Sequence, residues 1–354
     1  MLMQDAPPAG SRPRSLSQSP SPWQREMATA ITDPRELLAM LDLPASGLAG
    51  AATANGLFRL RVPRPFVARM RRGDPADPLL RQVWPLGAEG DEVPGYDLDA
   101  VGDLASLRGD GIIHKYAGRA LLIATGSCGV HCRYCFRRHF PYADENAARQ
   151  QWRGALQQLR TDTSIREVIL SGGDPLSLAD HKLADLVRTL DRIPHIERLR
   201  LHTRQPIVIP ARVDDALLTW LGSTRLQTVV VVHVNHPQEL DADTGLALGR
   251  LKDAGATLFN QAVLLAGVND DPAVLATLSE RLFAQGVIPY YLHLLDRVRG
   301  AAHFDVPRER AQRLYRELSA RLPGYLVPHL ALEEAGRASK TIIGMDATSG
   351  DIAT

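Results

Sequence analysis

From residue 120 onward, short apolar or β-branched runs alternate with amphipathic segments, and this alternation limits the possible folds more than any other feature. The pattern is typical of parallel β-strands joined by helices. Six such runs occur: ALLIAT, EVILSG, RLRLHT, TVVVVHV, TLFNQAVLL and IPYYLHLL. Residues 178–193, between the second and third runs, place apolar side chains on one helical face: Leu183, Leu186, Val187, Leu190 and Ile193. We therefore expect an α/β fold, as a partial barrel or an open parallel sheet, rather than a complete eight-stranded barrel.

The segments on either side of this region divide the chain further. Residues 1–24 are rich in Pro and Ser and predict a disordered tail, with a transit peptide as the alternative. A helix is expected to follow Asp33, which can cap it. We expect a helical N-terminal region over 25–110, the barrel over 111–305 and a C-terminal segment over 306–354.

Charge and hydropathy exclude several classes of protein. The chain has 41 basic and 40 acidic residues, so no overall field would attract nucleic acid or an anionic membrane. No apolar run is long enough to span a bilayer, and the N-terminus lacks the apolar core of a secretory signal. The sequence predicts a cytoplasmic protein without nucleic-acid or membrane partners. In that compartment cysteines are metal ligands or catalytic groups more often than disulfides.

Polar residues gather at the carboxyl ends of the six predicted strands, where parallel α/β folds carry their chemistry. In chain order the ends hold the cysteine loop, Gly172-Gly173-Asp174, His202-Thr203-Arg204, His233 with His236, Gln261, and His293 with Asp296. Any one of them is explained equally well as a strand-end cap or a satisfied core group. All six together favour a functional site.

Residues 126–140, GSCGVHCRYCFRRHF, contain the only three cysteines, Cys128, Cys132 and Cys135. The C-x3-C-x2-C spacing suits an iron–sulfur cluster or a zinc site, since both prefer soft ligands. Zinc needs a fourth ligand, for which His131 and His139 are the candidates. A 4Fe-4S cluster on three thiolates instead leaves one iron open to a substrate or cofactor.

The cysteine loop after the first strand resembles the radical S-adenosylmethionine (SAM) superfamily, in which the methionyl amine and carboxylate of SAM chelate the open iron. The sequence Gly172-Gly173-Asp174 is similar to the superfamily's glycine-rich contact with the methionyl amine, although a tight turn explains it as well. The resemblance implies a partial TIM-type barrel of six βα units. It also implies cofactor-binding roles for His233 and Gln261.

Six ordered blocks extend the resemblance to one family. They are HKYAGRALLIATGSCGVHCRYCFRRHF, VILSGGDPL, HTRQPIVIPAR, HVNHPQEL, NQAVLLAGVND and PYYLHLLDRVRGAAHF. In order and spacing they resemble the lysine 2,3-aminomutase family over roughly residues 75–345. The resemblance implies an isomerase that uses pyridoxal phosphate (PLP) beside SAM, and PLP requires a lysine for its Schiff base.

The chain has only four lysines, Lys115, Lys182, Lys252 and Lys340. Lys182 and Lys252 lie in helical segments, where a solvated surface position is ordinary. The resemblance identifies Lys340, in GRASKT, as the catalytic Schiff-base lysine. It also implies that Arg119 and Lys115 bind the PLP phosphate and that Tyr116 lies near the ring.

Three further residues define the substrate by resemblance. Arg137 pairs with the substrate carboxylate, and Asp296 and Glu333 hold the ε-ammonium of lysine. Two carboxylates facing one ammonium favour a cationic side chain over an acidic one. The alternative for Glu333 is a surface position beside Glu334.

Two departures from the catabolic lysine enzymes point to one branch of the family. Those enzymes have aspartate at the position of Glu333, and this chain ends fourteen residues after Lys340. Both features resemble the compact bacterial branch that makes (R)-β-lysine for translation elongation factor P. The implied partners are L-lysine, a reductant such as flavodoxin or ferredoxin, and indirectly elongation factor P with its lysyl ligase. The alternatives are a catabolic, glutamate or arginine 2,3-aminomutase, a radical SAM enzyme without PLP, and a metal-binding module.

Overall fold

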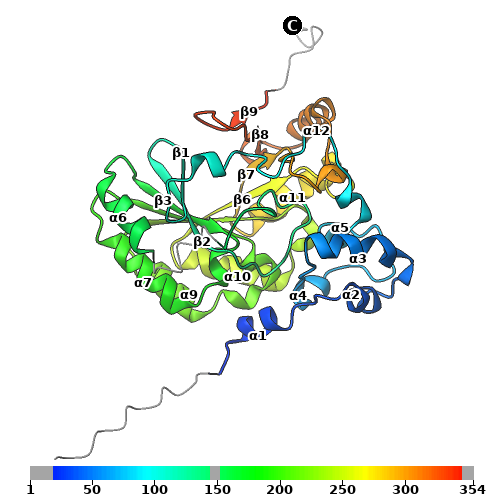
Figure 1. Ribbon diagram of the computed structural model, residues 1–354, viewed down its shortest axis with the longest axis horizontal. Helices are drawn as coiled ribbons and strands as arrows, with labels where there is room; N and C mark the ends of the chain where they lie inside the picture. Colours follow the sequence, from blue (N-terminus) through cyan, green and yellow to red (C-terminus); the bar gives the residue numbers. More distant parts are fainter. Residues whose placement is uncertain (1–18, 144–151, 345–354) are drawn as a thin grey trace, which may run out of the picture.

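The strands of the protein follow one another in space in the same order as along the chain. The computed structural model describes residues 19–143 and 152–344, and in it nine strands form one sheet in the order β1 to β9 (Figure 1). Their bounds are β1 Ile112–Tyr116, β2 Arg119–Thr125, β3 Glu167–Gly172, β4 Arg198–Thr203, β5 Gln227–Val232, β6 Thr257–Val263, β7 Ile288–His293, β8 His329–Leu332 and β9 Thr341–Ile342. Strands β2 to β8 are parallel, whereas β1 and β9 add antiparallel edges.

Helices connect the parallel strands and lie outside the sheet (Figure 1). Their bounds are α6 Arg153–Thr161, α7 Asp180–Asp191, α8 Gln205–Val208, α9 Asp215–Gly222, α10 Ala242–Asp253, α11 Pro272–Ala284 and α12 Arg308–Arg321. Within the described residues the edge strands β1 and β9 each pair with a single neighbour, so the sheet does not close. The architecture is therefore a partial TIM-type barrel, which confirms the predicted α/β class.

The six predicted strands are all present as β2 to β7, and β3 and β4 have the expected bounds. The predicted helix of residues 178–193 is the shorter α7, which buries four of the five apolar residues expected on one face: Leu183, Leu186, Val187 and Leu190. The fifth, Ile193, is also buried but lies two residues beyond the end of α7. Strand β8 was not expected. It pairs in parallel with β7 although it lies beyond the barrel boundary predicted at residue 305.

The N-terminal region consists of short helices, which gather beside one end of the barrel (Figure 1). Their bounds are α1 Pro22–Ala28, α2 Pro34–Met40, α3 Leu48–Leu57, α4 Arg64–Val67 and α5 Pro78–Arg81. Asp33 caps α2 as predicted, because its side chain accepts from the Arg35 amide at 2.8 Å. The tail predicted through residue 24 ends earlier, since Pro22 begins α1 and Trp23 is buried. Residues 1–18 of that tail lie outside the described residues.

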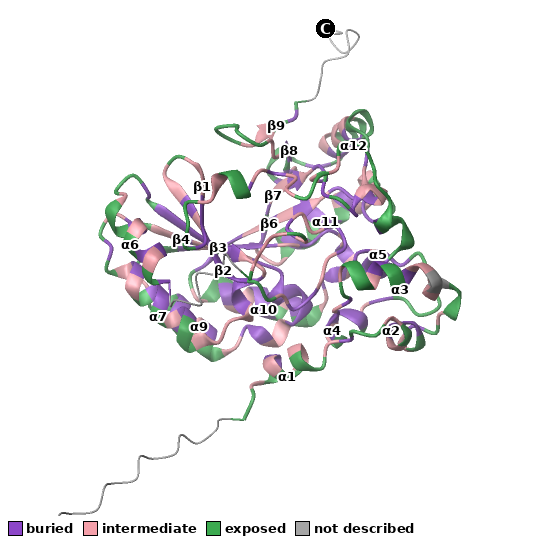
Figure 2. Ribbon diagram, viewed as in Figure 1, coloured by how far each residue is buried: buried purple, intermediate pink, exposed green. Residues whose placement is uncertain are grey.

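The apolar residues form three clusters, and two of them fix the loop that carries the cysteines. The largest lies between the strands and their outer helices, where Figure 2 shows buried residues along both. A second cluster joins the N-terminal helices to the barrel and includes Val130 of the cysteine loop. A third includes Tyr134, packed with Phe304. Burial of a large apolar side chain contributes about 1.5–3 kcal/mol, so Val130 and Tyr134 anchor the loop on both sides. No helix among the described residues is both long and apolar enough to cross a membrane.

Candidate active site

The cysteine loop begins directly after β2 and turns back on itself through a hydrogen bond from the Cys135 amide to the Cys132 carbonyl oxygen, at 3.0 Å. Arg133, between these two cysteines, is fully buried and forms an ion pair with Glu89 of the N-terminal region. Arg138 binds the same carboxylate at 2.7 Å. A buried carboxylate held by two guanidiniums fixes the loop backbone strongly, because loss of one partner leaves an uncompensated charge.

The three thiols lie close enough to influence one another electrostatically. Burial, and then the neighbouring Cys135, raise the pKa of Cys128 well above its ordinary value. Burial and then Cys132 raise the pKa of Cys135 to about 11. The apoprotein therefore disfavours the thiolate forms of Cys128 and Cys135. A bound metal centre supplies the positive charge that reverses this preference, so the donor set fits a cluster of soft metal ions.

His131 and His139, the two candidates for a fourth zinc ligand, contact backbone carbonyl oxygens and not the cysteines. Nδ1 of His131 lies 2.8 Å from the Arg59 carbonyl oxygen, and its ring stacks on Phe58. Nε2 of His139 lies 3.1 Å from the Arg299 carbonyl oxygen. Within residues 19–143 and 152–344, no group of three or more His, Cys, Asp or Glu side chains is placed so that it could hold a metal ion.

The glycines after β3 allow that turn to pack directly against the base of the cysteine loop. Gly172 has a φ of 116°, which favours glycine, and a Cβ there would lie 2.5 Å from the Thr125 carbonyl oxygen. A Cβ on Gly173 would lie 2.4 Å from the Ser127 carbonyl oxygen. The pair is thus required for close packing of two strand ends, whatever else its backbone binds.

Asp174 holds the next strand end in place. Its carboxylate accepts from Thr203 Oγ1 at 2.7 Å, and from the amides of Leu176, Arg204 and Gln205 at 3.0, 2.7 and 3.1 Å. These four donors occupy the carboxylate. The contribution of Asp174 to the site is consequently to fix the ends of β3 and β4.

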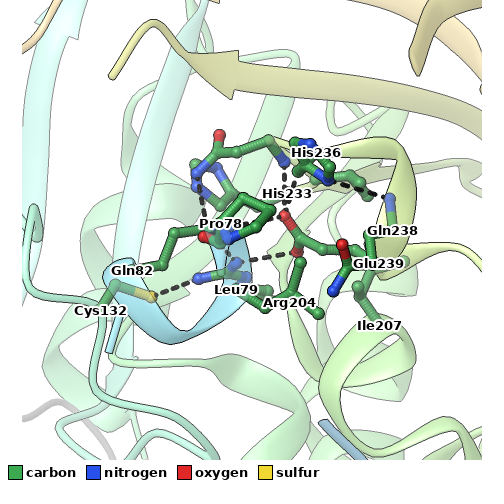
Figure 3. A network of polar contacts seen from close by, with 12 residues as sticks. Pro78, Leu79, Gln82, Cys132, Arg204, Ile207, His233, His236, Gln238 and Glu239 are labelled. Atoms are coloured by element: carbon green, nitrogen blue, oxygen red, sulfur yellow. Dashed lines mark hydrogen bonds and ion pairs between the residues drawn. The ribbon is translucent and has the colours of Figure 1, made fainter. Parts of the chain in front are cut away.

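His233 lies in the same group as the cysteines. Its Nε2 is 2.8 Å from the Tyr134 hydroxyl of the cysteine loop, and its ring bonds to the backbone of Gln261 on β6. Burial and then Arg204 lower the pKa of His233 to about 3, so the imidazole is neutral. Figure 3 shows His233 beside the polar network that connects Cys132 to Arg204 and Glu239.

A second group of charges forms around Glu333, which follows β8. Its carboxylate pairs with the ammonium of Lys340, and with that of Lys115 at 3.0 Å. Burial alone would raise the pKa of Glu333, but Lys340 and Lys115 outweigh it and lower the pKa to about 2. Lys340 also lies 5.8 Å from the ring centre of Tyr291. The structure therefore brings the predicted Schiff-base lysine and a predicted substrate-binding acid together, and Glu333 is not a surface residue.

Asp296, after β7, faces this group. Burial and then the charge of Glu333 raise the pKa of Asp296 to about 7, although Lys340 and Lys115 oppose the shift. The two acids thus behave oppositely: Glu333 is an ion-paired carboxylate, whereas Asp296 lacks enough positive charge around it to ionise readily. A cation entering the site would favour the ionised form of Asp296.

Arg137, in the cysteine loop, and Lys115, which pairs with Glu333, both bind Asp103. No sequence pattern indicated a role for Asp103. The Nε of Arg137 donates to Asp103 Oδ2 at 2.6 Å and its Nη1 to Ser171 Oγ at 3.1 Å. Asp103 also binds the Lys115 ammonium at 2.7 Å. Burial alone would raise the pKa of Asp103, but Arg137 and Lys115 lower it overall. A guanidinium has five N–H donors, so these contacts leave others for a substrate carboxylate.

Arg119 and Tyr116 lie at the far end of β2 from the cysteine loop. The guanidinium carbon of Arg119 is 4.6 Å from the Tyr116 ring centre, and Tyr116 hydrogen-bonds to Glu333. They belong to the Glu333 group rather than to the cysteine group. Lys182 and Lys252 are exposed on α7 and α10, which confirms their predicted surface position.

One further residue near Lys340, His202, was not assigned a role of its own from the sequence. His202 is the penultimate residue of β4, and its buried Nε2 has no hydrogen-bond partner among the described residues. Burial, and then the positive charges of Arg200 and Lys340, lower its pKa well below the ordinary value. An orphaned, neutral imidazole beside Lys340 fits a site that receives a polar ligand. The position of His202 near the end of a strand was the sequence signal that could have indicated a role in the site. Asp103 lies in an irregular segment that carries no motif, so no such signal existed for it.

Comparisons with known proteins show which families this chain resembles. Residues 108–197 match the family model described as a 4Fe-4S single cluster domain. The chain is 46% identical to the L-lysine 2,3-aminomutase of Haemophilus influenzae over 90% of this chain and 95% of that protein. It is 48% identical to the L-lysine 2,3-aminomutase of Escherichia coli over 90% of this chain and 93% of that protein. Among solved structures, a radical SAM methyltransferase from Sphaerobacter thermophilus matches with a TM-score of 0.43 and 18% identity, over 62% of this chain and 68% of that one.

An open barrel whose first parallel strand ends in a three-cysteine loop, with a match to a 4Fe-4S domain, defines a radical SAM enzyme. The extent and identity of the matches define it further: the chain belongs to the L-lysine 2,3-aminomutase family, and it is an isomerase.

Proposed function

We propose that this enzyme converts L-lysine to β-lysine with a cluster, SAM and PLP bound in one barrel. The observation that carries the proposal is the convergence of two acids, Asp296 and Glu333, on Lys340. The family match supports the reaction type, and the charges around these residues support the substrate.

The cysteine group is the proposed place of the cluster and SAM. Cys128, Cys132 and Cys135 would ligate three irons and leave the fourth to SAM. The backbone of Gly172 and Gly173 would approach the methionyl group from β3, while Asp174 holds that turn. His233 and Gln261, which lie together at β5 and β6, would contact the rest of SAM.

The Glu333 group is the proposed place of PLP. Lys340 would hold PLP covalently, and Arg119 and Lys115 would bind its phosphate near Tyr116. PLP bound there supplies a π-system that delocalises an unpaired electron beside the migrating nitrogen. The orphaned Nε2 of His202 supports a polar ligand at this position. Lys115 already pairs with Asp103 and Glu333, so a phosphate would share its ammonium with those acids.

Substrate choice would follow from the two acids and one arginine. Glu333 already accepts two alkylammonium groups of this chain, which are chemically the same as the lysine side chain. Burial, and then the charge of Glu333, raise the pKa of Asp296, because Lys340 and Lys115 compensate these effects only in part. An added ammonium would pair with Asp296, and Arg137 would hold the substrate carboxylate. An acidic substrate would instead meet the negative charge of Glu333 and an Asp296 that stays protonated, so no cation would pair with its side chain, which disfavours glutamate.

The onward use of the product rests on a finer resemblance. Glu333 in place of the aspartate of the catabolic enzymes supports the compact bacterial branch. We therefore propose that the product is (R)-β-lysine, made in the cytoplasm for the ligase that attaches it to elongation factor P. A low-potential donor such as flavodoxin or ferredoxin would reduce the cluster.

Anaerobic incubation with SAM, dithionite and one amino acid at a time tests this proposal. L-Lysine should give β-lysine, of R configuration by chiral chromatography, and L-glutamate and L-arginine should give at most traces. When PLP-free protein is assayed without added PLP, product formation should stop and the cluster should remain intact. A preference for glutamate or arginine would refute the substrate assignment, and full activity without PLP would refute the cofactor assignment.

A further inference from the structure

Arg204 lies at the end of β4 with one edge of its guanidinium directed at the cysteine loop. Its Nη1 is 2.8 Å from Cys132 Sγ (Figure 3). The same nitrogen is 2.7 Å from the Tyr134 hydroxyl. The Arg204 backbone amide donates to Asp174 at 2.7 Å, so the residue is fixed at both ends. Cys132 is thus the thiol of the three that receives a side-chain hydrogen bond from a cation in the described structure.

The other edge of the guanidinium is held by an acid and an amide. Nη2 lies 2.8 Å from Glu239 Oε2 and 2.6 Å from Gln82 Oε1. The side chain of Arg204 is 6% exposed and that of Glu239 is fully buried. Because the guanidinium is planar and both edges are engaged, it cannot turn toward solvent without breaking several charge-assisted hydrogen bonds.

The acid itself is fixed from behind. Glu239 Oε1 accepts from the amides of Asn235 and His236 at 2.9 and 3.0 Å. The negative charge of Glu239 therefore stays on the Nη2 side, and the Nη1 edge presents a donor and positive charge to the sulfur. In a buried environment both interactions are stronger than they would be in water.

We propose that Arg204 is a positioning residue that raises the reduction potential of the cluster through the Cys132 thiolate. The proposal rests on the proposed assignment of the three cysteines as cluster ligands. On reduction the cluster accepts one electron from a low-potential donor and becomes one unit more negative, and no proton moves. Hydrogen bonds to sulfur and nearby positive charge stabilise that more negative state. Arg204 keeps its proton throughout, since guanidinium is not deprotonated in proteins.

Two substitutions in the network have opposite expected effects. Arg204→Gln removes the cation beside the sulfur and lowers the potential. Glu239→Gln removes the countercharge while Arg204 remains, which raises the potential. Arg212→Gln is the matched control, because Arg212 is also fully buried but bonds to the Leu176 carbonyl oxygen at 2.7 Å and Asp180 at 2.8 Å.

The experiment is an anaerobic dithionite titration of the reconstituted full-length protein without SAM, with the reduced cluster followed by electron paramagnetic resonance. At a fixed potential, Arg204→Gln should lower the ratio of reduced to oxidised cluster at least tenfold, which for one electron corresponds to about 59 mV. Glu239→Gln should raise the ratio, and Arg212→Gln should leave it within about twofold of the unsubstituted protein.

Iron and sulfide content, measured first, separates this inference from the assignment on which it rests. Full cluster content in Cys132→Ala would refute the ligand assignment, whatever the potentials. With full content in all variants, an unchanged ratio in Arg204→Gln, or shifts of the same sign in Arg204→Gln and Glu239→Gln, would overturn the proposal. If Arg204→Gln holds no cluster, Arg204→Lys decides, because it keeps the charge with fewer donors: an intermediate potential supports the proposal, and loss of the cluster here too overturns it in favour of a structural role.

Discussion

Replacement of Asp296 by Asn should stabilise the lysine-free protein at high pH and should weaken substrate binding. Burial and Glu333 raise the pKa of Asp296 from 3.8 to about 7 in the folded protein. Between these two pH values the folded protein keeps the Asp296 proton that the unfolded chain has released. The free energy of unfolding therefore decreases as the pH rises toward 7. Asparagine keeps the shape of the side chain and never ionises.

The magnitude follows from the width of that pH window. Between pH 3.8 and about 7, the free energy of unfolding of the wild-type protein falls by about 1.4 kcal/mol for each pH unit. The total loss above pH 7 is therefore at most about 4 kcal/mol. Asp296 is partly exposed, which reduces the value. Between pH 5.5 and 8, the stability of Asp296→Asn relative to wild type should therefore increase by about 2 kcal/mol or less, with no further increase above pH 7.

Urea unfolding of cluster-loaded protein under anaerobic conditions, without lysine, measures this difference at each pH. The same variant should lose lysine turnover a few-hundred-fold or more, since a buried ammonium without its partner costs about 3–5 kcal/mol. A gain in stability combined with a loss of function distinguishes a substrate-binding acid from a structural one. If Asp296→Asn is less stable than wild type at pH 8, or if the difference does not change with pH, the account of Asp296 is wrong.

Three other predictions concern the remaining charges and ligands. Glu333→Gln should reduce lysine turnover by a few-hundred-fold or more, about 3–5 kcal/mol, with cluster content unchanged. Near wild-type rates in both acid variants would remove the physical basis of the substrate assignment. Replacement by Ala of any one of Cys128, Cys132 and Cys135 should abolish cleavage of SAM, measured as released 5′-deoxyadenosine, and retained cleavage in any of the three would contradict the ligand assignment. Lys340→Ala should abolish the pyridoxyl label that borohydride fixes on the protein, as mass spectrometry of peptides would show; a label found on Lys115 would mean that the wrong lysine was identified.

The sequence was sufficient for the parts of the protein that depend on periodic patterns. The β-branched runs predicted six parallel strands, and apolar spacing predicted the buried face of α7, because long periodic elements are decided locally. Strand β8 was missed because its four residues carry too short a pattern to separate it from a loop. Its place beside β7 is decided by tertiary contacts.

The candidate site was predictable where residues form motifs and not where they meet across the fold. The three-cysteine loop and the strand-end residues were visible as spacing, and Lys340 stood out by resemblance and because lysines are few. Asp103 has no motif, and its role depends on Arg137 and Lys115 reaching it from other segments. The contact between Arg204 and Cys132 joins residues 72 positions apart, which no local pattern reports.

Transfer of nitrogen within one substrate molecule tests the central claim most directly. The anaerobic protein, supplied with PLP, SAM and dithionite, would receive L-lysine labelled with nitrogen-15 at the α-amino group, and carbon–nitrogen coupling in the product would be read by nuclear magnetic resonance. The account predicts that the label appears on C3 of β-lysine, without dilution by unlabelled ammonium in the buffer and without stoichiometric loss of SAM. Label that stays on C2 while SAM is consumed to 5′-deoxyadenosine would contradict it.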